Sequence, residues 1–289
     1  GGWNEVVQVA AAHGNKLQIF DFSFNLATKY TFWSGLIGGA FLTMATHGTD
    51  QTIVQRLLAA RNQRDSRRAL LASGVIVLFQ FTVFLLIGVL LFVFAQHTPL
   101  LSGGESTDRI LPLFLLREMP TGFAGLLLAS IIAVAMSNAS GSLNSLAASS
   151  VLDFSALRLG NREPADDAGF LRRSRRMTLF WGLVLMGFGL LTWGPVLEAG
   201  LTVAAFPFGS LLGLFLLGTL NGRSNATGAL VGMFAGLITV ICVWRLTSIA
   251  YTWYFLIGSA TTFLVGSLVS VLTRPRESEN LCAHMNAAS

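Results

Sequence analysis

The sequence predicts an all-α membrane protein from its composition and from the length of its uncharged stretches. Hydrophobic residues make up 53% of the chain and charged residues 11%, and the mean hydropathy is +0.65, which is unlike a soluble domain. Each uncharged window is long enough for the about 20 residues that a helix needs to cross a bilayer. We therefore predict about seven transmembrane helices. The windows are 30–49, 69–104, 119–152, 177–197, 199–222, 224–244 and 246–273.

The arginines predict which side of the membrane each loop faces. Eleven of them lie in the segments 56–68 and 158–176, and short cytoplasmic loops carry an excess of Lys and Arg. These segments are therefore expected in the cytoplasm of a multi-pass protein of the plasma membrane. The N-terminus is then outside and the C-terminus inside. The predicted organisation is an extracellular segment (1–30), a transmembrane helical domain (31–273) and a cytoplasmic tail (274–289).

The first 30 residues lack the charged and apolar regions of a signal peptide. A chain that starts outside without such a signal is expected to be the C-terminal piece of a longer membrane protein. Cys242 lies within a window and Cys282 in the tail, so we expect neither a disulfide nor a metal cluster.

The first window ends in the sequence His47-Gly48-Thr49-Asp50. Gly48 can break the helix, and Thr49 or Asp50 can cap a new amphipathic helix that runs past Arg56. Two interpretations of Asp50 and Arg56 remain open. They are either part of a capped, solvated interfacial helix or a cytoplasmic gate of charge pairs that break and re-form.

The second window carries one strongly polar side chain at depth, that of Gln80. A lone amide in a membrane helix either forms a hydrogen bond to a neighbouring helix or contacts a ligand. We include Gln80 among the candidate residues of a solute pocket.

The third window is rich in hydroxyl and amide side chains among alanines and glycines. Such groups are costly at membrane depth unless they pack against other helices or line a path for something polar. Close helix packing and a solute or ion path both remain open. The polar residues are Ser130, Ser137, Asn138, Ser140, Ser142, Asn144, Ser145, Ser149 and Ser150.

Val134, Ser137 and Asn138 share one face of this helix, because they are spaced i, i+3 and i+4. The Val134 carbonyl, the Ser137 hydroxyl and the Asn138 amide offer neutral oxygen ligands to a hard cation. Neutral ligands suit a monovalent ion that must later leave. Calcium or magnesium would call for carboxylates, and the window contains none.

The fifth window contains Pro207, Gly209 and Gly213, which favour a kink or a hinge. The chain lacks the HExxH, GxSxG, Walker A and CxxC patterns, so hydrolytic, nucleotide-driven and redox enzymes have no support. We expect no enzyme activity. No basic-aromatic surface suggests nucleic acid.

Taken together, three stretches resemble the sodium:solute symporter family, and they follow one another in the family's order over nearly the whole chain. They are Gly48-Thr49-Asp50-Gln51 with Val54-Gln55-Arg56, the serine-rich run from Ser137 to Ser145 with Asp153-Phe154, and Phe215-Leu216-Leu217-Gly218 with Asn225 and Gly228.

The resemblance implies a LeuT-type fold of two inverted five-helix repeats, with solute and sodium bound near the midplane. The chain resembles the second repeat, core helices six to ten, followed by two peripheral helices. The absent first repeat would be a necessary partner, along with the lipid bilayer. The implied function is alternating access, in which Na⁺ is the coupling ion that drives uptake of a small solute.

The resemblance also places the family's second sodium site on Val134, Ser137 and Asn138. Family members usually carry Ser or Thr at the last position, so the longer Asn138 side chain is a departure. The helix breaks at the midplane add Thr43, Thr46 and Thr202 to the candidate solute pocket.

Two positions argue against a sugar as the solute. Relatives that carry sugars use contacts at positions that align approximately with Thr43, Thr46, Val77 and Leu201. Val77 and Leu201 cannot form the hydrogen bonds that a polyol requires. The resemblance favours the branch that carries organic anions, vitamins and iodide. A solute sensor built on the same fold is the alternative, and a long cytoplasmic signalling domain would distinguish it.

Overall fold

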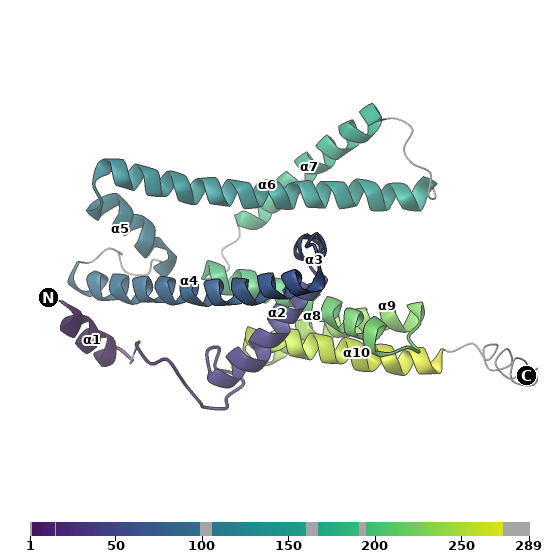
Figure 1. The fold of residues 1–289 in the computed structure, drawn as a ribbon, viewed down its shortest axis with the longest axis horizontal. Helices are drawn as coiled ribbons and strands as arrows, with labels where there is room; N and C mark the ends of the chain where they lie inside the picture. Colours follow the sequence, from purple (N-terminus) through teal and green to yellow (C-terminus); the bar gives the residue numbers. More distant parts are fainter. Residues whose placement is uncertain (1, 15, 99–105, 160–166, 191–194, 274–289) are drawn as a thin grey trace, which may run out of the picture. The chain divides into compact units, whose positions relative to one another are not determined.

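The computed structural model of the chain describes residues 2–14, 16–98, 106–159, 167–190 and 195–273, and every regular element among them is helical. Two compact units can be distinguished, one from residues 1–93 and 197–289 and the other from residues 94–196. Figure 1 labels the helices. The elements are α1 (Trp3–Ala12), the π-helical turn η1 (Ser34–Gly38), α2 (Gly39–Thr49), α3 (Gln51–Leu58), α4 (Gln63–His97), the 3₁₀ turn η2 (Thr107–Arg109), α5 (Ile110–Glu118), α6 (Thr121–Leu159), α7 (Asp167–Gly189), α8 (Val196–Leu220), α9 (Ala226–Leu246), the 3₁₀ turn η3 (Tyr251–Trp253) and α10 (Tyr254–Leu272).

The core of the first unit lies where α2, α8, α9 and α10 meet. Its central side chains are buried or nearly so, and they come from all four helices and from η3. Partly buried residues such as Leu42, Leu201 and Phe206 pack around them. The core residues are Ala45, Ala205, Leu212, Val240, Tyr251, Tyr254 and Phe255.

Helices α9 and α10 pack closely because small residues recur at every fourth position along both. Gly228, Gly232 and Gly236 on α9 are buried, as are Gly258, Thr262, Gly266 and Ser270 on α10. A Cβ atom added to Gly232 would lie 2.6 Å from the Thr262 carbonyl oxygen and 2.8 Å from Gly266 Cα. Only glycine therefore fits, and the two backbones are in contact as in membrane small-residue interfaces.

The first predicted membrane helix is helical from residue 32 to residue 49, and it contains the π-helical turn η1 near its start. The predicted break is present, but Gly48 does not cause it. The helix runs through Gly48 and ends at Thr49, and the extended Asp50 (φ −75°, ψ 112°) separates α2 from α3. The Asp50 carbonyl oxygen then accepts the N–H groups of Ile53 and Val54, which starts α3.

The second unit consists mainly of α5, α6 and α7. Helices α6 and α7 form an extensive contact, in which the Trp181 indole N–H donates to the Ser150 hydroxyl at 2.8 Å. Ala147 and Val151 of α6 are buried, and Gly182 of α7 lies against Leu143.

Five helices in the described part of the chain are long and apolar enough to cross a membrane, by length and composition. They match five of the seven predicted spans: α4, α6 up to Leu152, α8, α9 and the segment Tyr251–Leu272. The two remaining predicted spans are helical as well. The first is divided between η1 and α2, and the fourth is the second half of α7, whose first half carries four arginines.

The predicted extracellular segment contains a helix that the sequence analysis did not anticipate. This helix, α1, is followed by His13, whose ring lies 5.7 Å from that of Phe92 in α4, and Lys16 Nζ lies 4.4 Å from the centre of the Phe92 ring. The predicted tail, 274–289, lies outside the described residues.

Candidate functional site

Some polar side chains of α6, among them Ser130 and Ser137, lie on a face that α7 does not cover, whereas Ser150 accepts a hydrogen bond from Trp181 of α7. At about 100° per residue, Ser130, Ser137 and Gly141 fall on one side of the helix. Leu143 and Ala147, which pack toward α7, fall on another. Every residue from 131 to 140 is exposed. A polar face on an apolar helix of this length is expected to be covered by protein or to line a hydrated path, because lipid offers it no partner.

The three candidate sodium ligands lie together on this polar face. The Asn138 Nδ2 group donates to the Val134 carbonyl oxygen at 3.1 Å, and the Ser137 side chain is exposed one residue earlier. The set fits a monovalent cation chemically, because it offers three neutral oxygens and no carboxylate. Asn138 must turn its amide for its oxygen, rather than its nitrogen, to face such an ion.

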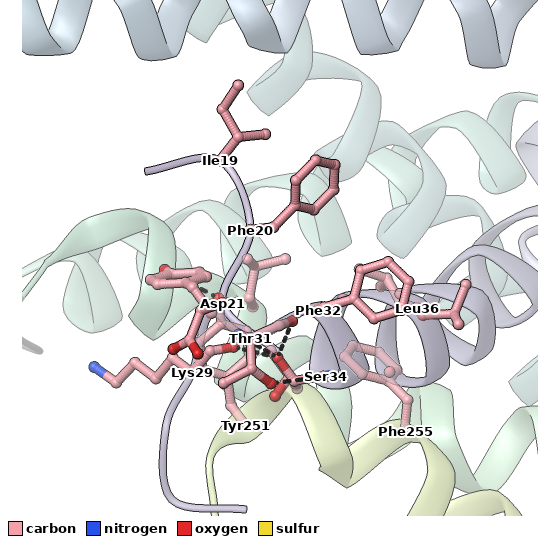
Figure 2. Close-up of a pocket in the computed structure, with 17 residues that line it drawn as sticks. Ile19, Phe20, Asp21, Lys29, Thr31, Phe32, Ser34, Leu36, Tyr251 and Phe255 are labelled. Atoms are coloured by element: carbon pink, nitrogen blue, oxygen red, sulfur yellow. Dashed lines mark hydrogen bonds between the residues drawn. The ribbon is translucent and has the colours of Figure 1, made fainter. Parts of the chain in front are cut away.

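The first unit contains a cavity of about 500 Å³ where the segment before α2 meets the starts of η1 and η3. Figure 2 shows the polar ends of Asp21 and Lys29 on one side of this cavity and Phe32, Leu36 and Phe255 on the other. We call it the α2 cavity. Its apolar part is formed by Phe20, Phe32, Leu36, Leu42, Leu201 and Phe255.

Three glycines shape the helical wall of the α2 cavity. A Cβ atom at Gly35 or Gly39 would meet no atom within 4 Å, so bare backbone borders the open space there. Gly38 is different, because a Cβ atom would lie only 2.3 Å from the Thr252 carbonyl oxygen. Gly38 thus lets η1 approach η3 closely. π-Helical turns often occur at functional sites.

Ser34 fixes the segment that enters the cavity wall. Its buried hydroxyl donates to the Lys29 carbonyl oxygen at 2.8 Å and accepts the Thr31 N–H at 3.0 Å. Thr252 also lines the cavity, and its hydroxyl oxygen is buried without a hydrogen-bond partner in the described structure.

A polar cluster lies at the rim of the α2 cavity. The Glu198 carboxylate accepts from Lys29 Nζ at 2.5 Å and from the Tyr30 hydroxyl at 3.1 Å. The Tyr251 hydroxyl donates to that of Tyr30 at 3.3 Å. Burial, with smaller contributions from Tyr251 and Glu198, raises the pKa of Tyr30 well above its usual value. The pKa of Asp21 is lowered, chiefly because its carboxylate accepts the backbone N–H of Ser23.

None of the four predicted solute-pocket residues lines the α2 cavity. Thr43 is exposed, and the Thr46 hydroxyl donates to the Leu42 carbonyl oxygen at 3.0 Å. The Thr202 hydroxyl donates to the Glu198 carbonyl oxygen at 2.7 Å. Gln80 is exposed on α4.

The predicted gate residues flank the break between α2 and α3. Asp50 is the extended residue of the break itself, and Arg56 belongs to α3. The side chain of Arg56 lies outside the described residues.

Comparison with known proteins shows the family. The profile of the sodium:solute symporter family matches residues 3–236. The chain belongs to this family. It is 32% identical over 245 residues to the human sodium/iodide cotransporter, an alignment that covers 82% of this chain and 37% of that protein. It is 30% identical to a sodium/sialic acid symporter of Proteus mirabilis, over 85% of this chain and 50% of the other.

A solved structure is similar as well. The structure of a sodium-coupled sialic acid symporter in a substrate-bound, outward-open state superposes with a TM-score of 0.72 at 28% identity, over 95% of this chain and 57% of that chain. The predicted all-α membrane fold of LeuT type is thereby confirmed. The chain spans about half the length, or less, of the relatives described here.

Sequence reasoning missed the α2 cavity and the contact between Lys29 and Glu198. The two residues are 169 positions apart, and nothing in their local sequence couples them. The aromatic residues Phe20, Phe22 and Phe24 alternate in the sequence before the first span, and this was the available sign that the segment packs rather than extends into solvent.

Proposed function

We propose that this chain forms part of a sodium-coupled symporter that carries a small solute across the plasma membrane by alternating access. The observation that carries the proposal is that Ser137 and Asn138 are exposed on α6, a helix long and apolar enough to cross a membrane. Family membership supports it, since several relatives are named as sodium-coupled transporters of iodide, sialic acid, vitamins or monocarboxylates.

Na⁺ is the proposed coupling ion, and Val134, Ser137 and Asn138 are its proposed ligands in this chain. The bound ion would supply a positive charge that couples solute movement to the sodium gradient. The three groups supply neutral oxygens that hold the charge and release it again. The relatives are longer than this chain. We therefore include a first repeat as a partner in the proposal, and this repeat would supply further sodium ligands.

The proposed solute is small and is not a sugar. Its proposed pocket is formed by Thr43, Thr46, Gln80 and Thr202, which do not line the α2 cavity. The mainly apolar lining of the α2 cavity supports a compact organic anion or vitamin-like solute, because a polyol would leave its hydroxyls without partners there.

The break at Asp50 is the proposed cytoplasmic gate, with Arg56 as its second charge. The short α3 that follows would lie at the cytoplasmic surface. In this orientation the start of α2 and the α2 cavity face outward, and the arginine-rich segments face inward.

The decisive experiment is uptake by the complete protein in proteoliposomes. We expect accumulation of a monocarboxylate or iodide under an inward Na⁺ gradient and none under an equal K⁺ gradient. Glucose should not accumulate. Uptake that does not depend on the Na⁺ gradient would indicate a channel instead of a symporter. Binding without any uptake would indicate a sensor.

Orientation has a separate test. Single cysteines at Gln63 and Ala168, in a background in which every native cysteine, including Cys242 and Cys282, is replaced, should resist membrane-impermeant thiol reagents in intact cells. A cysteine at Ser106 should react. The opposite labelling pattern would invert the proposed topology.

A further inference from the structure

The rim of the α2 cavity contains a carboxylate held by two convergent donors. Glu198 Oε2 accepts from Lys29 Nζ at 2.5 Å, and Oε1 accepts from the Tyr30 hydroxyl at 3.1 Å. An ammonium and a phenol that together bind both oxygens of a carboxylate form a recognition site for that group. Here a side chain of the protein itself occupies the site.

The donors and the occupant differ in their position relative to the cavity. Lys29, Tyr30 and Tyr251 line the α2 cavity, whereas Glu198 does not. Glu198 therefore reaches the donors from the first turn of α8, outside the cavity. Figure 2 shows the Lys29 ammonium directed away from Phe32 and Phe255, so an anion reaches it at the rim of the cavity, where it would take the place of Glu198.

The Glu198 contact is also easy to exchange. The Lys29 side chain is 48% exposed and that of Glu198 25% exposed, and ion pairs in such positions are weak because water screens them. An external carboxylate that binds Lys29 would release Glu198 to solvent without leaving a buried charge unpaired.

The lining of the rest of the cavity indicates what kind of ligand body fits there. Figure 2 places Lys29 and Asp21 on one side and Phe32 and Phe255 on the other. A ligand that fits has one anionic end and a compact apolar or aromatic body.

We propose that Lys29 and Tyr30 are the anion-binding end of an outer site for small amphipathic monocarboxylates, and that Glu198 occupies this end until such an anion displaces it. This site deepens the proposed function and rests on it for the outward orientation of the cavity. It is distinct from the pocket near Thr43, Thr46 and Thr202. Glu198 is thus an internal competitor that keeps the affinity of the outer site low.

Benzoate is a suitable probe, because it joins a carboxylate to a compact aromatic body. A single cysteine at Leu201, which lines the cavity, reports occupancy through its rate of labelling by a thiol reagent. The complete protein, with every native cysteine replaced, is labelled at equal Na⁺ on both sides, so that no transport is required. The measured quantity is the benzoate concentration that halves the labelling rate.

We expect half-protection at millimolar benzoate in the parent protein, since a tethered carboxylate competes at an effective concentration on the order of millimolar. Glu198→Gln removes the competing charge and should lower this concentration roughly tenfold. Lys29→Gln should raise it about tenfold or more, and Lys29→Arg should restore it. Benzamide, which is neutral, should protect poorly.

Two control variants separate local exchange from general charge. Lys16→Gln removes an exposed lysine that lies over Phe92 instead of at the rim and should leave half-protection unchanged. Asp21→Asn removes a carboxylate held by Ser23 and should tighten benzoate less than Glu198→Gln does. Equal effects of Asp21→Asn and Glu198→Gln would overturn the exchange.

Other results also contradict the proposal. Protection by benzamide equal to that by benzoate would show an apolar site without anion recognition, and half-protection unchanged in Lys29→Gln would remove Lys29 from the site. Failure of the proposed function looks different. Benzoate protection that follows these variants, in a protein without sodium-coupled uptake, would refute symport and leave the outer site intact.

Discussion

Helices α8, α9, α10 and α4 are all apolar enough to cross a membrane, yet α8, α9 and α10 are partly buried and α4 is not. About a third of the apolar window is buried in α8 and in α10, whereas none of the window of α4 is buried, although α4 has the highest hydropathy of all. Hydropathy predicts that a helix enters the membrane and does not predict what covers it. Packing follows the spacing of small residues, because in lipid the apolar surface alone provides no drive for helices to associate.

Helix α6 adds a second lesson to this comparison. It is also rich in small residues, but only 6% of its apolar window is buried. Its small residues are accompanied by hydroxyls and amides on an exposed face, whereas the small residues of α9 are glycines that contact α10 directly. Small residues thus serve backbone contact in one region and a polar face in the other.

The largest expected effect separates buried from uncovered apolar side chains. Leu217 of α8 is 1% exposed and Leu78 of α4 is 70% exposed. Leu217→Ala should destabilise the protein by about 2 to 5 kcal/mol, because it leaves a cavity in the α8–α10 packing. Leu78→Ala should change the stability by less than about 0.5 kcal/mol. Thermal unfolding of the two variants in detergent measures the difference.

An equal loss of stability in the two variants would sharpen the comparison in another way. It would mean that Leu78 is covered in the complete protein, and that the exposed face of α4 is an interface with another part of that protein.

The next effect concerns glycines. A Cβ atom at Gly232 would clash with α10, whereas one at Gly218 would meet no atom within 4 Å. Gly232→Ala should therefore destabilise the protein by about 1 to 3 kcal/mol through overpacking. Gly218→Ala should stabilise it by about 0.5 to 1 kcal/mol through helix propensity. Unfolding temperatures that shift in the same direction would break the proposed distinction between contact glycines and surface glycines.

A third prediction addresses the polar face of α6. Ser137→Ala removes one proposed oxygen ligand and should raise the Na⁺ concentration for half-maximal uptake roughly tenfold, which corresponds to ~1.4 kcal/mol. Asn138→Ser should lower that concentration. A hydroxyl can offer its oxygen to a cation while its hydrogen is donated elsewhere, whereas the Asn138 amide must rotate before its oxygen can face the ion. Sodium titration of unfolding temperature supplies a readout independent of transport.

Normal expression of both variants with unchanged sodium dependence would contradict the sodium assignment. Ser130→Ala, on the same face but outside the proposed ligand set, is the matched control and should leave the sodium dependence unchanged.

The smallest effect is expected at Thr46. Its hydroxyl donates to the Leu42 carbonyl oxygen in this structure, so the variant Thr46→Val loses one hydrogen-bonding group of the proposed pocket, worth about 1 kcal/mol. The solute concentration for half-maximal uptake should rise several-fold, and that for Na⁺ should rise less. A solute affinity that does not change would move the pocket away from Thr46.

The sequence by itself determined the class of the protein, most of its helices and the position of its break. Long uncharged windows are a local property, and five of them correspond to helices of membrane-spanning length. The break before Gln51 was also predicted, although Asp50 makes it and Gly48 does not. Residues 134, 137 and 138 share a face, because residues three and four positions apart lie on the same side of a helix.

The tertiary structure decided what the local pattern cannot contain. It showed that Asn138 bonds to the Val134 carbonyl, that α7 covers only one face of α6, and that α9 and α10 meet through glycines spaced four residues apart. It also brought Lys29 and Tyr30 to Glu198 across more than half of the chain. Such contacts depend on how helices pack after they form. A single sequence shows the periodicity of each helix, but it does not show which partner each helix face will contact.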